Sequence, residues 1–92
     1  MKQIENKEIA ILNTTQTYKD LIMSCVTTIP KDGFNYQLNK KIERIEKALE
    51  GDKPKYDIED ADFEFLKSKV MEMSWAIYDK KLTAFQDYIN SL

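Results

Sequence analysis

Apolar residues recur at helical spacing through most of this chain, with breaks at Pro30 and at Gly51–Pro54. In the first segment they fall at i, i+3, i+4, i+7, i+8 and i+11, as Tyr18, Leu21, Ile22, Cys25, Val26 and Ile29. This spacing lines one face of a helix with 3.6 residues per turn. Thr17 and Asp20 have the spacing of a capping box, and Pro30 disfavours helical geometry in the residue before it. The pattern predicts an amphipathic helix that starts at Thr17 and is stopped by Pro30.

A second amphipathic segment runs from about Asn35 to Glu50. Its apolar residues form a narrow seam: Phe34, Leu38, Ile42, Ile45 and Leu49. Gly51 stands where helices commonly end in a left-handed residue, and the polar stretch Gly51–Lys55 predicts an exposed loop. The sequence therefore predicts a second helix that ends at this loop.

A third segment begins at Asp57, which we interpret as an N-cap because Asp60 is placed to reach back to it. Its apolar face consists of Phe63, Leu66, Val70 and Met73, and the last segment carries Leu82, Phe85, Ile89 and Leu92. We place a break between the two near Ser74–Asp79, because both of these residues can cap a helix and Trp75–Ile77 interrupts the apolar stripe. The chain is therefore expected to hold three or four helices.

Residues 1–16 carry the weakest pattern. Ile9 and Ile11 indicate a short extended segment, and Ile4 can pair with it across Asn6–Lys7 as a two-stranded hairpin. A hairpin alone is marginal in water, so a frayed arm is an equal alternative. We expect a single, mainly all-α domain over residues 1–92, with three to four antiparallel helices and a hairpin or an extended arm at residues 1–16.

The composition argues against catalysis. The chain has 92 residues, no histidine, one cysteine and two glycines. It therefore lacks the side chain best suited to proton transfer near neutral pH, which is also the commonest transition-metal ligand. Two glycines leave no room for a phosphate-binding loop, and Cys25 lies on an apolar helix face with no histidine to activate it. We expect no enzyme activity, no metal, no cofactor and no small-molecule substrate.

The charge pattern bears on partners and compartment. The formal net charge is −2, and the second helix carries four basic residues roughly on one side: Lys40, Lys41, Arg44 and Lys47. Glu43 and Glu46 lie among them, whereas nucleic-acid binding depends on basic side chains that neutralise phosphates. No apolar run approaches the ~20 residues of a membrane span. We expect neither nucleic acid nor membrane as a partner and, with one cysteine and no signal peptide, a cytoplasmic protein.

The strongest charge feature is an acidic cluster at the predicted start of the third helix: Asp57, Glu59, Asp60, Asp62 and Glu64. Carboxylates there stabilise the positive end of a helix dipole by roughly 0.3–1 kcal/mol each. The same cluster can also be interpreted as an acidic docking face. A calcium loop would need oxygen ligands at alternating positions around a glycine bend, which this segment lacks. We keep its first four residues as candidate partner-binding residues.

Four aromatic residues complete the candidate binding set: Tyr36, Tyr56, Trp75 and Tyr78. Tyr36 and Tyr56 fall at or beside predicted loops, away from the apolar stripes. Tyrosine and tryptophan are enriched at interface hot spots because they bury rigid area and keep a polar group. Partial burial in the core is the alternative for each of them. A small chain with exposed aromatics has apolar surface to cover, so we expect protein partners and a homo-oligomer.

The order of the segments is itself a pattern. Thr17–Ile22 opens a helix, a charged helix over Lys40–Leu49 follows, and an acidic helix start over Asp57–Leu66 precedes a break and a final helix. Over residues 9–90 this order resembles a group of small proteins encoded by tailed bacteriophages. Tyr18 stands where that group has leucine, and Trp75–Tyr78 replaces its aliphatic residues. The resemblance implies a viral origin, no catalytic residues, and a role in particle assembly or in handling the host.

These observations lead to three expected functions. The first is a non-catalytic phage-type protein that acts by protein–protein association, in virion assembly or as an accessory factor. The second is an inhibitor of a host defence or metabolic protein that docks through the acidic helix face. The third is a small DNA-binding regulator that uses the second helix.

Overall fold

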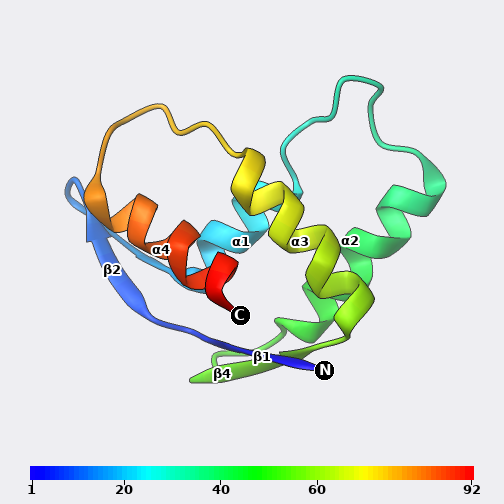
Figure 1. Cartoon of the computed structure of the whole chain (residues 1–92), viewed down its shortest axis with the longest axis horizontal. Helices are drawn as coiled ribbons and strands as arrows, with labels where there is room; N and C mark the ends of the chain where they lie inside the picture. The colour runs from blue at the N-terminus through cyan, green and yellow to red at the C-terminus, as the bar shows by residue number, and fades with distance from the viewer.

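The computed structural model describes all 92 residues, which form four helices and four short strands in an α+β fold (Figure 1). The elements follow in the order β1 (Lys2–Glu5), β2 (Glu8–Ile11), β3 (Thr14–Thr17), α1 (Tyr18–Val26), α2 (Tyr36–Ala48), β4 (Lys55–Ile58), α3 (Asp60–Glu72) and α4 (Lys80–Ser91). The prediction of a mainly all-α helical bundle is therefore wrong. Each strand is only four residues long, which is too short for alternation of period two to stand out in the sequence.

The first sheet joins the start of the chain to its middle. β1 pairs antiparallel with β4, with Ile4 opposite Tyr56, and no other strand joins the pair. The inner face buries three side chains: Ile4, Tyr56 and Ile58. The expected pairing of Ile4 across Asn6–Lys7 is wrong, because its strand partner lies far along the chain and local spacing could not indicate it.

The second sheet is the hairpin formed by β2 and β3. A two-residue turn, Leu12–Asn13, connects them, and Ile11 lies opposite Thr14. Ile11 is buried and Ile9 is partly buried against the core. Residues 1–16 are therefore neither a frayed arm nor one hairpin. They contribute β1 to one sheet and most of the hairpin to the other.

The helix starts show how far the capping signals can be relied on. The predicted capping box of α1 is confirmed, with the Asp20 N–H donating to Thr17 Oγ1 and the Thr17 N–H donating to Asp20 Oδ2. The predicted break before the last helix is also confirmed, because α3 ends at Glu72 and Asp79 caps α4. Asp57 as the cap of α3 is wrong. Strand β4 continues to Ile58, so the cap moves to Glu59.

The core is a single cluster of 17 buried residues, to which all four helices or their caps and both sheets contribute. α1 packs against α3, and α3 packs against α4. The rings of Tyr18 and Phe85 meet edge-on with centroids 5.0 Å apart. Ile29 is an exception to the predicted stripe, since α1 ends at Val26 and leaves Ile29 exposed in the following loop. None of the helices is long and apolar enough to cross a membrane.

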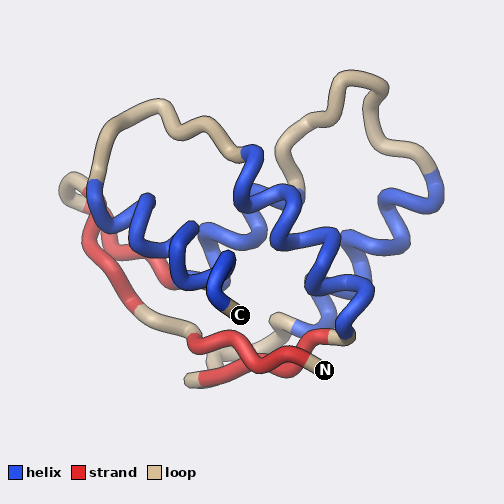
Figure 2. The backbone as a smooth tube through the Cα atoms, viewed as in Figure 1, coloured by secondary structure: helices blue, strands red, loops and turns tan.

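α2 is the least embedded helix. It buries Ile45 and the capping residue Leu49, while Phe34 at the other end of the predicted seam is exposed. The helix contacts mainly β4 and α3. Figure 2 shows two long loops on the same side of the molecule, one leading into α2 and the other joining α3 to α4. The second of these loops positions the candidate site.

Candidate functional site

An apolar groove of about 310 Å³ lies beneath the α3–α4 loop. We call it the Trp75 groove, and it is lined by Ile11, Gln16, Leu21, Ser24, Met73, Trp75, Ala76, Ile77 and Leu82. The hairpin supplies one wall, α1 supplies the floor, and the loop with the start of α4 supplies the other wall. Seven of its nine lining residues are hydrophobic, so the groove suits an apolar side chain better than a polar ligand.

Two hydrogen bonds hold the walls of the groove in place. Lys81 Nζ donates to the Ala10 carbonyl at 2.6 Å and so joins the start of α4 to the hairpin. Gln86 Nε2 donates to the Val70 carbonyl at 2.9 Å and joins α4 to α3. The loop between these helices is therefore fixed at both of its ends.

Trp75 carries the one buried polar side-chain atom that has no hydrogen-bond partner, its Nε1. The indole packs against the core while the residue as a whole stays partly exposed. A buried tryptophan N–H usually finds an acceptor, and leaving one unpaired costs roughly 1–3 kcal/mol. The Trp75 indole is thus the one buried side-chain donor that the chain itself leaves unpaired.

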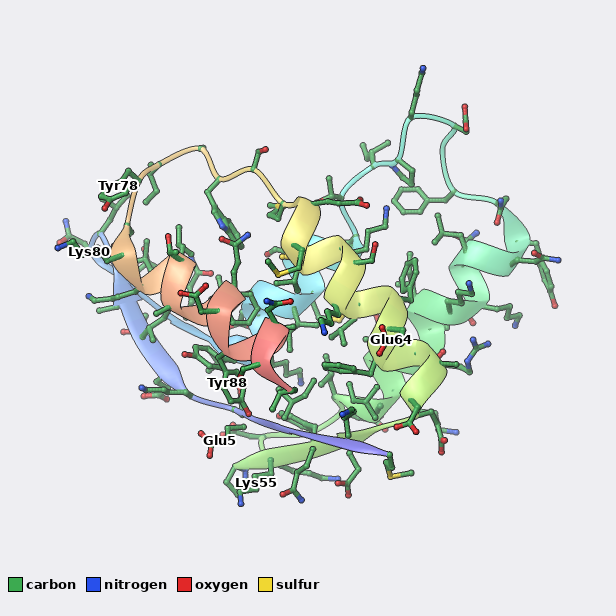
Figure 3. The ribbon with its side chains drawn as sticks, viewed as in Figure 1. Glu5, Lys55, Glu64, Tyr78, Lys80 and Tyr88 are labelled. Atoms are coloured by element: carbon green, nitrogen blue, oxygen red, sulfur yellow. The ribbon has the colours of Figure 1, made fainter.

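The rim of the groove exposes large apolar side chains. Tyr78 is 84% exposed and Leu12 is 77% exposed, and Ile77 adds a third, less exposed one. Leu12 and Tyr78 adjoin groove residues along the chain, and Ile77 itself lines the groove. In the view of Figure 3, Tyr78 and Lys80 lie at the end of the molecule that holds the hairpin turn. We call Leu12, Ile77 and Tyr78 the apolar rim.

Leu12 is also the only non-glycine residue with a positive φ, at 56°. This conformation costs an ordinary L-residue roughly 1–2 kcal/mol, and two-residue hairpin turns therefore favour glycine, asparagine or aspartate there. The chain places an exposed leucine at a strained position where it makes no contribution to the core. Strain combined with exposure is more typical of a contact residue than of a structural one.

Only two of the eight predicted binding residues, Trp75 and Tyr78, belong to the Trp75 groove and its rim. Tyr36 lies at the start of α2, 74% exposed, with Lys40 Nζ 5.5 Å from its ring centroid. Tyr56 is buried in β4, contrary to its expected position beside a loop. Its hydroxyl donates to the Gly51 carbonyl at 2.6 Å and accepts from the Lys53 N–H, so it fastens the loop before β4.

Three of the four predicted acidic residues, Asp57, Glu59 and Asp62, line one pocket, but they share it with Arg44 and Lys47 and do not form a purely acidic face. Asp57 lies exposed on β4, and Glu59 occupies the N-cap position of α3 without a side-chain capping hydrogen bond. Asp60 pairs with the Met1 amino group at 2.8 Å, which lowers the pKa of its carboxyl. Asp62 is largely buried and accepts from Arg44 Nη2 at 2.9 Å and from Arg44 Nε. That hydrogen bond also raises the pKa of Arg44.

Three of the four basic residues of α2 are likewise engaged within the molecule, and Lys47 is not. Arg44 is held by Asp62, and Lys40 pairs with Glu43 at 3.6 Å. Lys41 Nζ lies 5.4 Å from the ring centroid of Phe65. These contacts break the continuity that a phosphate-binding face requires.

Cys25 lies buried in α1, as its place on the apolar stripe predicts. Burial raises the pKa of its thiol to about 12. A thiol that stays protonated is a poor nucleophile. No group of three or more cysteine, aspartate and glutamate side chains is arranged to hold a metal ion.

Sequence reasoning missed Leu12, Ile77 and the hairpin side of the groove. A signal for Leu12 existed, because Leu12–Asn13 separates two short runs rich in β-branched residues, as a two-residue hairpin turn does. No comparable signal exists for the groove, whose walls come from four different parts of the chain. No known protein family, no curated protein and no solved structure matches this chain. Its function is therefore inferred from its own geometry.

Proposed function

We propose that this chain is a non-catalytic binding module that associates with another protein through the Trp75 groove and its apolar rim. The observation that carries the proposal is the coincidence, in one place, of an apolar groove and exposed Leu12, Ile77 and Tyr78. Single exposed apolar residues are ordinary on a protein surface, but a contiguous group around a groove marks an interaction site.

The energetics support the same choice. Fully burying a large apolar side chain contributes about 1.5–3 kcal/mol. A partner that covers Leu12 and Tyr78 would therefore gain several kcal/mol of binding free energy, before the entropic costs of association are subtracted. Both residues are almost fully exposed in the isolated chain, so little of this gain has been used in folding. Interfaces draw most of their affinity from a few such central side chains.

The sequence resemblance implies a phage origin. It also implies one of two roles, which are virion assembly and an effect on a host protein. The groove is compatible with both, since it selects an apolar side chain and not a particular partner. The acidic α3 start is a weaker docking surface, because Asp60 and Asp62 are paired within the molecule. We therefore centre the proposal on the groove.

The test uses the purified chain as bait in lysates of uninfected and phage-infected bacteria. Tyr78→Ser should reduce capture of a specific partner at least tenfold, because it removes the only aromatic ring on the rim. Tyr36→Ser is the matched control, since Tyr36 is as exposed but lies on α2 away from the groove. A partner found only in infected lysate supports assembly, and one found in both supports a host target. If the two variants lose capture of the partner equally, or if neither variant loses it, the groove is not the binding site.

A further inference from the structure

The outer edge of β3 is free over Thr14–Gln16. In a hairpin with a two-residue turn, the residues that flank the turn form a hydrogen-bonded pair, so Ile11 pairs with Thr14 and Ile9 with Gln16. The N–H and C=O of the intervening Thr15 then point away from β2. No hydrogen bond from outside the hairpin reaches Thr14, Thr15 or Gln16 through backbone or side chain. Thr15 itself is exposed.

One outward backbone group on each of β1 and β2 has a side-chain partner, and β4, which has none, carries the charged residues Lys55 and Asp57. On β2, the Ala10 carbonyl accepts a hydrogen bond from Lys81 Nζ at 2.6 Å. On β1, the Glu5 N–H donates to the Tyr88 hydroxyl at 2.9 Å, and Figure 3 shows these two residues facing each other. Proteins protect exposed edges with such contacts, or with charges, prolines and bulges. β3 has none of these over Thr14–Gln16.

The composition of β3 favours a copy of itself as the partner. Two identical strands that pair antiparallel about a two-fold axis place the central residue opposite itself and its two neighbours opposite each other, so a charge in so short a strand would lie close to its own copy. β3 consists of Thr14, Thr15, Gln16 and Thr17 and carries no charge. Threonine pairs across strands favourably through their β-branched side chains and hydroxyls.

The surface area of the chain points the same way. A folded monomer of 10.8 kDa is expected to expose about 5,500 Å². This chain exposes 6139 Å², an excess of about 600 Å². A stable interface buries about 800 Å² on each partner, so the excess is of the size that pairing with a second copy would cover.

We propose that β3 pairs antiparallel with β3 of a second copy, with Thr15 opposite Thr15, to form a four-stranded sheet across a two-fold axis. The ladder is centred on Thr15, because the Thr17 N–H is already bonded to Asp20. The Trp75 groove borders this edge through Gln16, and its rim supplies the apolar area that so short a ladder needs. The inference rests on the proposed function and names the second copy as the partner.

Thr15→Cys tests the register directly. Hydrogen-bonded residues opposite each other lie about 5.5 Å apart between Cα atoms, within the range that a disulfide spans. Under mild oxidation Thr15→Cys should become a disulfide-linked dimer on non-reducing gels. Thr83→Cys, an exposed threonine on α4, should stay monomeric under the same conditions, and Cys25 is buried in both variants. Equal cross-linking of the two variants, or of neither, would overturn the inference.

A second pair of variants tests the edge without a new bond. Thr15→Pro removes the outward N–H and leaves the hairpin ladder intact, whereas Thr15→Val keeps that N–H. Sedimentation velocity should show wild type and Thr15→Val as dimers at about 100 μM, and Thr15→Pro as a monomer with unchanged circular dichroism. A monomeric wild type, or a folded Thr15→Pro that remains dimeric, contradicts the inference. If Thr15→Pro fails to fold, the cysteine cross-link decides.

These outcomes separate the inference from the proposed function. If the wild type is a monomer but a different protein is captured in a Tyr78-dependent way, only the second copy is wrong. If Thr15→Cys forms the dimer but Tyr78→Ser leaves capture unchanged, the pairing of β3 with a second copy is supported and binding through the groove is not.

Discussion

Leu12 is an exposed residue whose backbone conformation lowers the stability of the fold. Replacing it with asparagine should raise the free energy of unfolding by about 1 kcal/mol, because asparagine tolerates a positive φ and leucine does not. The same change removes an apolar rim residue, so partner capture should fall while stability rises. Urea titration and the pull-down measure the two effects. A destabilised Leu12→Asn would show that the leucine belongs to the fold after all.

Cys25 provides a prediction about pH. Burial raises the pKa of its thiol from the ordinary value of 9.0 to about 12 in the folded chain. Below about pH 9 the thiol is protonated in both states, so it makes no difference to the pH dependence of stability. Between about pH 9 and 12 the unfolded chain loses this proton more readily, and stability falls.

The measurement compares urea unfolding of the wild type and Cys25→Ala at about pH 8 and pH 10. The wild type should lose more stability than the variant over this interval, since tyrosine and lysine titrate equally in both. A thiol reagent should also label Cys25 only as the chain unfolds. Rapid labelling of the folded chain would contradict the burial of this side chain.

Secondary-structure elements divide into those that the sequence could predict and those that it could not. The helices were predictable because their apolar stripes and caps are local: Thr17 with Asp20 opens α1, and Asp79 opens α4. β1 and β4 were not, since each is stable only against the other and they lie far apart in the sequence. The predicted start of α3 at Asp57 is wrong for the same reason, because Asp57 belongs to strand β4.

The candidate site was predictable only in part. Trp75 and Tyr78 were identified because they interrupt or leave the helical stripes, which is a local property. The prediction for Tyr56 is wrong because its position beside a loop does not indicate the sheet that buries it. The groove itself depends on how the hairpin folds against α1 and the α3–α4 loop, and no local pattern encodes that packing.

The contact between the hairpin and α4 can be tested as an element-level feature. Lys81→Met keeps the length of the side chain but cannot donate to the Ala10 carbonyl. We expect amide hydrogens in β2 and β3 to exchange several-fold faster, with little change in β1 and β4. Lys80→Met is the matched control, as Lys80 makes no hydrogen bond or ion pair. If both variants exchange alike, the Lys81 bond does not hold the hairpin.

At the scale of the whole molecule, a small core is combined with a large exposed surface. Only 18 of the 92 residues are buried, and the area exceeds that of a typical monomer of this mass. The unused edge of β3, the strained turn and the apolar rim all lie around the same groove. This concentration supports the proposal that the chain acts by association.

The most direct test replaces Tyr78 with a benzophenone amino acid, which cross-links to whatever covers it when illuminated. The same residue at Tyr36 is the control, because both tyrosines are highly exposed. Association through the Trp75 groove predicts a discrete product from position 78, either a dimer or an adduct of one other protein, and little from position 36. Equal yields at the two positions, or no product from position 78, would contradict it.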